Sequence, residues 1–134
     1  MVAVDTNIVI RLLTRDDPEQ ASRAIALFES EEIWVSKTVF LETEWVLRSV
    51  YGLSGDRAVA VLRGLAGLPN VRVEDSVAVS RALEWAVLGL ELADALHLAS
   101  RRESDKFVSL DEKLVKRAKR AGVSRVALLQ GVRA

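Results

Sequence analysis

Hydrophobic residues along the chain occur in two patterns that predict two kinds of secondary structure. Short apolar runs at 2–4, 33–35, 71–73, 107–109 and 126–128 predict short buried strands. Between these runs, apolar residues recur every three or four positions, as they do on one face of an amphipathic helix. This spacing predicts helices over residues 6–13, 19–30, 37–51, 56–65, 76–88, 93–103 and 112–121.

Strands that alternate with helices of about 10–15 residues favour a parallel sheet, because each connection must return over a face of the sheet. We therefore expect an α/β fold with a central parallel sheet of four to five short strands and helices on both faces. No internal repeat or linker interrupts the pattern, so a single domain over residues 1–134 is expected. In such sheets, ligands bind beyond the carboxyl ends of the strands.

Composition narrows the chemistry that the chain can perform. Half of the 134 residues are hydrophobic and none is cysteine, which excludes disulfides, thiolate metal sites and thiol nucleophiles. A metal ion would be held by oxygen atoms or by the single histidine, His97. No apolar run approaches the roughly 20 residues that cross a bilayer, and the apolar start lacks the features of a secretion signal. We expect a soluble, cytoplasmic protein.

Charge is balanced overall but unevenly distributed along the chain. Residues 101–134 contain ten basic and four acidic residues, although the whole chain has 19 of each sign. This excess fits a basic nucleic-acid surface beside an acidic site, and it fits a solvated helix face equally well. The candidate phosphate contacts are Lys113, Lys116, Arg117, Lys119 and Arg120, with Arg11 and Arg15 at the other end of the chain.

Three aspartates lie at boundaries of predicted elements. Asp5 follows the first strand, Asp111 follows the extended segment from 107, and Asp94 opens the segment Asp-Ala-Leu-His. Each has an ordinary alternative role as a helix N-cap, in which the carboxylate accepts a backbone N–H. None of the three identifies a site by itself.

A glutamate also interrupts the most apolar helix, predicted over 37–51. Glu42 shares a helix face with Val39, Trp45 and Val46. We expect its carboxylate to be buried with a partner or a metal, because burying an unpaired charge costs several kcal/mol. Glu44 competes for this role, and periodicity leaves both residues open because the helix is apolar nearly all round.

Together the four acids suggest a metal site. Clustered carboxylates repel one another and are tolerated best when divalent cations neutralise them. Hard oxygen ligands favour Mg²⁺ or Mn²⁺, and such ions bind phosphate oxygens and activate water for attack on a phosphodiester. The sequence thus predicts metal-dependent hydrolysis of nucleic acid.

Four stretches of the chain resemble the PIN-domain ribonucleases, and among them the VapC-type toxins of toxin–antitoxin pairs. The stretches are VAVDTNIVIRLL, VSKTVFLETEWVLRSVYGL, LADALHLAS and FVSLDEKLVKRAKRAGV, which follow one another in the family's order. The family's acids correspond to Asp5, Glu42, Asp94 and Asp111. Its glutamate normally lies three residues before the Trp-Val-Leu stretch, which selects Glu42 over Glu44.

The resemblance implies a PIN-like fold and an endoribonuclease that uses Mg²⁺ or Mn²⁺. It also implies a homodimer, and a higher assembly in which a cognate, VapB-like antitoxin holds it inactive. An arginine of that antitoxin would pair with the acidic cluster. By the same resemblance Thr6 and Ser109 support the site by orienting carboxylates or bound water. Asn7 is expected to shape the turn after Asp5.

Other conspicuous residues have more ordinary interpretations. We interpret His97 as a packed, structural histidine, although it lies three residues after Asp94 on a shared helix face. Trp34, Trp45 and Trp85 are interpreted as core or dimer-interface anchors.

Competing functions remain for the chain as a whole. A haloacid-dehalogenase-type phosphoryl transferase needs a second aspartate where Asn7 stands, and a receiver domain needs an acidic pair that Val2 to Val4 lack. A non-catalytic module that binds a basic partner, and a stand-alone RNA-processing nuclease, are the alternatives that remain.

Overall fold

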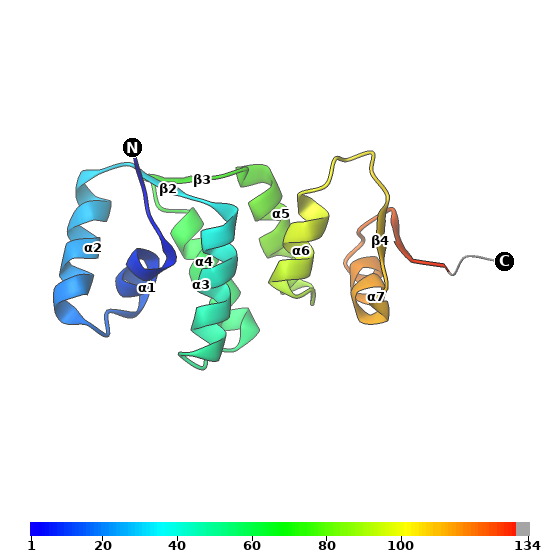
Figure 1. Ribbon diagram of the computed structural model, residues 1–134, viewed down its shortest axis with the longest axis horizontal. Helices are drawn as coiled ribbons and strands as arrows, with labels where there is room; N and C mark the ends of the chain where they lie inside the picture. Colours follow the sequence, from blue (N-terminus) through cyan, green and yellow to red (C-terminus); the bar gives the residue numbers. More distant parts are fainter. Residues whose placement is uncertain (131–134) are drawn as a thin grey trace. The chain divides into compact units, whose positions relative to one another are not determined.

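The computed structural model describes residues 1–130, and its elements follow the predicted order (Figure 1). The described strands are β1 (Val2–Ala3), β2 (Ile33–Val35), β3 (Val71–Val73), β4 (Phe107–Ser109) and β5 (Val126–Leu128). The described helices are α1 (Thr6–Thr14), α2 (Pro18–Ser30), α3 (Lys37–Ser49), α4 (Gly55–Ala66), α5 (Ser76–Val87), α6 (Leu92–Ala99) and α7 (Glu112–Arg120). The chain divides into two compact units, residues 1–79 and the residues from 80 onward.

In the N-terminal unit, β1, β2 and β3 form a three-stranded parallel sheet with β2 in the centre. Val2 pairs with Ile33, and Ile33 pairs with Val71, so the apolar runs align in register. Ile33 and Val35 of β2 are fully buried, whereas Trp34 between them is 38% exposed. The alternation is that expected of a strand whose successive side chains point to opposite faces.

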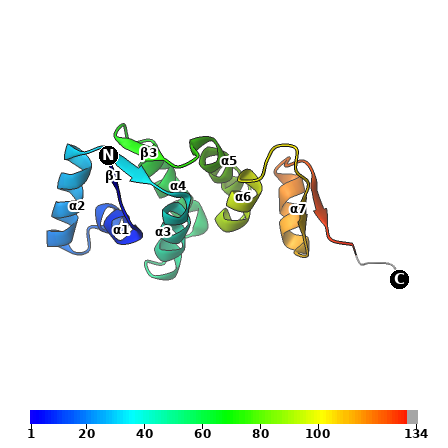
Figure 2. The same ribbon diagram turned by 45° about the horizontal axis from the view of Figure 1, so that its top comes forward.

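The helices of this unit pack in pairs. Contacts join α1 to α2, α3 to α4 and α1 to α3, and both views show the first two pairs side by side (Figures 1 and 2). Ile10, Leu47 and Ala58 form a core cluster, one from each of α1, α3 and α4. Tyr51, just after α3, packs its ring against the same cluster. This packing fixes the direction of α1, which begins at Thr6, directly after the candidate residue Asp5.

In the C-terminal unit, β4 and β5 form a two-stranded parallel sheet, and α7 connects them. Phe107 pairs with Val126, and α7 contacts both strands. Leu114, Val115 and Ala118 form the buried side of α7, while its lysines point to solvent. The start of α7, and with it Asp111, is therefore held at the carboxyl end of β4.

The predicted PIN-like α/β class with short parallel strands is confirmed. The described strands pair as two sheets, of three and two strands, where the sequence pattern predicts one central sheet. Helix α6 ends at Ala99 instead of 103, because a turn follows in which the Asp105 carboxylate accepts the Arg102 N–H. Within the described part of the chain, no helix is long and apolar enough to cross a membrane.

Candidate functional site

Asp5 is separated from the end of β1 by Val4 alone, and it caps α1. Its Oδ1 accepts the Ile8 N–H at 3.2 Å, so the predicted capping role is confirmed. The side chain is exposed, which leaves the other carboxylate oxygen accessible to a ligand. Thr6 is buried at the first position of α1. The junction between β1 and α1 thus presents one carboxylate oxygen that makes no hydrogen bond within residues 1–130.

The two glutamates of α3 have opposite environments. Glu42 is exposed, so the expectation that it is buried is wrong. The reason is the direction of packing, since the buried side of α3 consists of Phe40, Thr43, Glu44 and Leu47. Glu44 is 5% exposed and forms an ion pair with Arg48, one turn further along α3. The carboxylate that is free for a ligand is therefore that of Glu42, the residue that the family resemblance selects.

Asp94 lies in the first turn of α6 and is not its N-cap. The helix begins at Leu92, and Glu91 is the cap residue without a side-chain cap bond, so the cap interpretation of Asp94 is wrong. Burial raises the pKa of the half-buried Asp94 carboxyl, and the negative charges of Glu91 and Asp111 raise it further. The positive charges of His97 and Arg117 oppose this rise. Asp94 thus lies in a locally acidic environment within the C-terminal unit.

Asp111 lies between β4 and α7 and caps that helix. Its Oδ1 accepts the N–H groups of Lys113 at 2.9 Å and Leu114 at 3.2 Å. Ser109 Oγ accepts the Asp111 N–H at 3.0 Å, so this hydroxyl orients the backbone that carries the carboxylate. Asp111 is exposed and lies close enough to Asp94 to act on its pKa.

Each unit therefore carries two of the four predicted acids. Asp5 and Glu42 belong to the N-terminal unit, and Asp94 and Asp111 belong to the C-terminal unit. None of the four forms an ion pair within residues 1–130. Among these residues no group of three or more His, Asp or Glu side chains is arranged to hold a metal ion. The four-carboxylate metal site stays a prediction.

One acidic neighbour was missed in the sequence. Glu91 is the second-largest influence on the Asp94 pKa, and it also approaches Arg117 at 3.7 Å across the unit. The spacing in the sequence could have identified this neighbour, because residues three positions apart lie on one face of a helix. Glu91 precedes Asp94 by that interval.

Two other interpretations need correction. His97 is exposed, so it is not the packed histidine that its leucine neighbours suggested. Trp34 and Trp45 are 38% and 57% exposed and are not core residues, whereas Trp85 is half-buried. The dimer-interface interpretation of these tryptophans stays a prediction.

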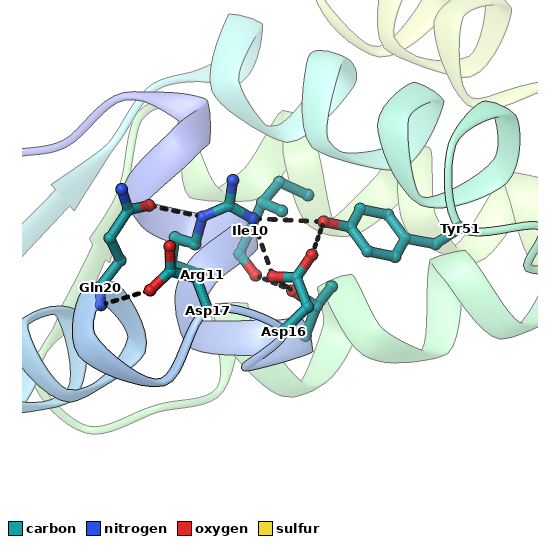
Figure 3. A network of polar contacts seen from close by, with 7 residues as sticks. Ile10, Arg11, Asp16, Asp17, Gln20 and Tyr51 are labelled. Carbon is teal, nitrogen blue, oxygen red and sulfur yellow. Dashed lines mark hydrogen bonds and ion pairs between the residues drawn. The ribbon is translucent and has the colours of Figure 1, made fainter.

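The candidate basic residues differ in how firmly they are held. On α7, Lys113, Lys116, Lys119 and Arg120 are exposed, and Arg117 is half-buried. Arg15 is exposed at the end of α1 in a left-handed conformation with φ 54°. Arg11 is instead fixed by a polar network with Asp16, Gln20 and Tyr51 (Figure 3).

The fold and these residues define an α/β protein with free carboxylates at the starts of helices that follow parallel strands. The chain belongs to the PIN domain family, whose model matches residues 2–120. PIN domains are generally metal-dependent nucleases, and the match includes Asp5, Glu42, Asp94 and Asp111. No curated protein matches the chain.

Proposed function

We propose that this protein is a metal-dependent endoribonuclease, and that it acts as the VapC-type toxin of a toxin–antitoxin pair. The observation that carries the proposal is the state of its four family acids. All four are exposed or half-buried, and none is neutralised by a cation within residues 1–130, in contrast to the paired Glu44. Keeping carboxylates unpaired in a family of metal-dependent nucleases supports a role as metal ligands.

The chemistry of the donor set fits Mg²⁺ or Mn²⁺. All four side chains offer hard carboxylate oxygens, which these ions prefer over nitrogen and sulfur ligands. When bound, such an ion lowers the pKa of water and binds phosphate oxygens, which is what hydrolysis of a phosphodiester requires. Asp5, Glu42, Asp94 and Asp111 would hold it, and Ser109 keeps the backbone of Asp111 in place.

Recognition of RNA is proposed to use the exposed cations of α7. Asp111 caps this helix, and Lys113, Lys116 and Lys119 follow it on exposed positions. Lysines at such positions attract the backbone phosphates of RNA whatever its base sequence. They therefore contribute to affinity more than to specificity. An RNA strand drawn to α7 would therefore pass close to Asp111.

Regulation is proposed to come from a VapB-like antitoxin, with the toxin itself a homodimer. The unpaired carboxylates offer an arginine from such a partner a charge-assisted, bidentate contact. A partner bound in this way would compete with the metal for the same oxygens. Inhibition by the antitoxin and binding of the metal would therefore depend on the same carboxylates.

The proposal is tested by RNA cleavage with the full chain, freed of any partner. We expect cleavage only with Mg²⁺ or Mn²⁺, and loss of cleavage in Asp94→Asn with an unchanged circular dichroism spectrum. Asp56→Asn is the matched control, because Asp56 is an exposed aspartate in the first turn of α4, as Asp94 is in the first turn of α6. Cleavage without metal, or full activity of Asp94→Asn, would refute the mechanism.

The alternatives predict different results. A non-catalytic interaction module would bind a basic peptide but cleave no RNA under any metal condition. A stand-alone RNA-processing nuclease would cleave RNA but would have no small reading frame of antitoxin size immediately upstream of its gene. Titration of Mn²⁺ into Asp5→Asn and Asp94→Asn adds a separate test, since both variants should weaken binding of the metal if the two pairs of acids share it.

A further inference from the structure

A pocket of about 330 Å³ lies between α1 and α2 in the N-terminal unit. Its polar wall combines two arginines with two amides, and its apolar wall is formed by short aliphatic side chains. The lining residues are Asn7, Ile8, Arg11, Gln20, Arg23, Ala24 and Leu27. None of these residues has a carboxylate, so the polar wall lacks an anionic group.

Arg11 is the fixed element of this wall. Its Nε donates to Gln20 Oε1 at 2.7 Å, and its Nη1 donates to Asp16 Oδ1 at 2.8 Å and to the Tyr51 hydroxyl at 3.3 Å. Its remaining terminal nitrogen, Nη2, makes no hydrogen bond within residues 1–130. Because the guanidinium is already held in place, little side-chain entropy is lost when Nη2 binds a ligand.

The two amides add further donors. Gln20 uses its Oε1 as an acceptor for Arg11, which leaves its Nε2 to donate. Figure 3 shows this amide nitrogen and the free nitrogen of Arg11 on the same side of the network, away from Asp16 and Tyr51. The Asn7 side chain makes no hydrogen bond with the described part of the chain. The pocket therefore has several donors that make no hydrogen bond within residues 1–130.

The charge balance disfavours a highly charged ligand. Arg11 is paired with Asp16, and Arg23 is paired with Glu19 at 2.6 Å, so much of the positive charge near the pocket is compensated. What remains is a set of N–H donors suited to a group that only accepts hydrogen bonds. A phosphodiester is such a group, with one negative charge and two free oxygens, and it is the repeating unit of an RNA backbone.

The position along α1 relates the pocket to the proposed nuclease site. Asp5 caps α1, Asn7 lies two residues further, and Arg11 follows Asn7 by four, so these two share a helix face. We infer that the pocket binds a backbone phosphodiester of the RNA substrate next to the one that is cleaved. This inference rests on the proposed function, because it names how that substrate is held.

The test measures binding of RNA separately from cleavage. In the full-length Asp94→Asn protein without metal, the affinity for a fluorescent single-stranded polyuridine is followed by anisotropy over a series of salt concentrations. Gln20→Glu keeps the oxygen that accepts from Arg11 and replaces the free donor by an acceptor. We expect this variant, and likewise Asn7→Asp, to bind RNA about tenfold more weakly. The slope of log K against log salt should also become shallower, because the added carboxylate offsets positive charge that neutralises RNA phosphates.

Gln130→Glu is the matched control, because it adds the same negative charge at the other, exposed glutamine of the chain. If Gln130→Glu and Gln20→Glu lost the same RNA affinity, the effect would be general repulsion between the added charge and RNA. That result would overturn the inference. So would an unchanged affinity in both pocket variants, provided that their unfolding midpoints match the parent. A polyglutamate peptide that binds more tightly than RNA, and is weakened by Gln20→Glu, would assign the pocket to an acidic peptide instead.

Cleavage by the protein with Asp94 intact distinguishes this inference from the proposed function. RNA binding that depends on Gln20, without any cleavage, would support the pocket and refute the nuclease. RNA cleavage, together with RNA binding that is unchanged by the Gln20 and Asn7 substitutions, would support the nuclease and refute the pocket.

Discussion

The Tyr51 hydroxyl donates a hydrogen bond to Asp16 Oδ2 at 2.7 Å, across 35 residues of sequence. Tyr51 lies just after α3 and packs its ring on the core cluster of Ile10, Leu47 and Ala58. Asp16 lies in the turn between α1 and α2, and its carboxylate also forms an ion pair with Arg11. The partly buried Tyr51 thus connects the turn after α1, and Arg11 with it, to the core.

Removing the hydroxyl tests this connection. Tyr51→Phe should lower the free energy of unfolding by about 1 kcal/mol, because it deletes a net hydrogen bond while retaining the packed ring. Urea denaturation followed by circular dichroism measures the change. Leu47→Ala, at a residue 2% exposed, provides the scale, with an expected loss of about 2–5 kcal/mol. A Tyr51→Phe protein as stable as the parent would show that the network contributes nothing to folding.

Asp16 should make stability depend on pH in the acidic range. Hydrogen bonds from Tyr51 and Thr14, and the charge of Arg11, hold the pKa of the Asp16 carboxyl below its ordinary value. Since the folded pKa lies below the unfolded one, this stabilisation is complete above about pH 4 and is lost as the pH falls through the folded pKa. The difference in urea midpoint between the parent and Asp16→Asn should therefore shrink below that pH. A difference that grows on acidification would contradict the lowered pKa.

The two glutamates of α3 should respond in opposite ways. Glu42→Gln should reduce metal-dependent RNA cleavage by at least tenfold and leave the unfolding midpoint unchanged, because its exposed carboxylate has no cation partner within residues 1–130. Glu44→Gln should destabilise the protein by about 1–2 kcal/mol, because it removes the buried negative charge that pairs with Arg48. Each variant is the control of the other. Reversed effects would transfer the site role to Glu44.

Thr43, between these glutamates, should tolerate loss of its hydroxyl. The residue is fully buried, and its Oγ1 has no hydrogen-bond partner within the described residues. Thr43→Val has nearly the same shape and removes the desolvation cost of that oxygen, so the protein should become more stable by about 1 kcal/mol. Thermal unfolding measures the gain. A clear loss of stability would mean that the hydroxyl is hydrogen-bonded in solution.

Asp111 caps α7, and two substitutions can separate this cap from the role in RNA cleavage that we propose for its carboxylate. Asp111→Asn keeps a side-chain oxygen that can cap α7, so stability should stay near that of the parent while cleavage is lost. Asp111→Ala removes the cap as well and should cost about 1 kcal/mol in addition. Paired denaturation and cleavage measurements distinguish the two. Equal instability of both variants would show that the charge, and not the cap, stabilises the start of α7.

Secondary structure was the part of the fold most accessible from the sequence. The strands β2 and β3 begin and end at the predicted residues, because their Val- and Ile-rich runs are bounded by polar caps. The predicted start of α6 at residue 93 is one residue late, because Glu91 precedes the helix at Leu92 without a side-chain cap bond. Asp94 consequently occupies the first turn of the helix, where the pattern suggested a cap.

The candidate site was accessible only in part. Periodicity could not distinguish Glu42 from Glu44, because tertiary packing decides which side of a nearly apolar helix is buried. The resemblance to the family selects Glu42, which is exposed and has no ion-pair partner within residues 1–130, and its role in the site stays a prediction. The Arg11–Asp16–Tyr51 network joins residues up to 40 positions apart and left no periodic trace in the sequence.

The caps at Asp5 and Asp111 also limit how these residues can coordinate a cation. In each, Oδ1 is engaged by backbone amides, and within residues 1–130 Oδ2 accepts no hydrogen bond. Each aspartate can thus act as a monodentate ligand without unwinding the first turn of its helix. Monodentate carboxylates suit the small octahedral shell of Mg²⁺ and disfavour the larger shell of Ca²⁺, which gains from bidentate binding. The same caps that stabilise the starts of α1 and α7 would in this way favour Mg²⁺ over Ca²⁺.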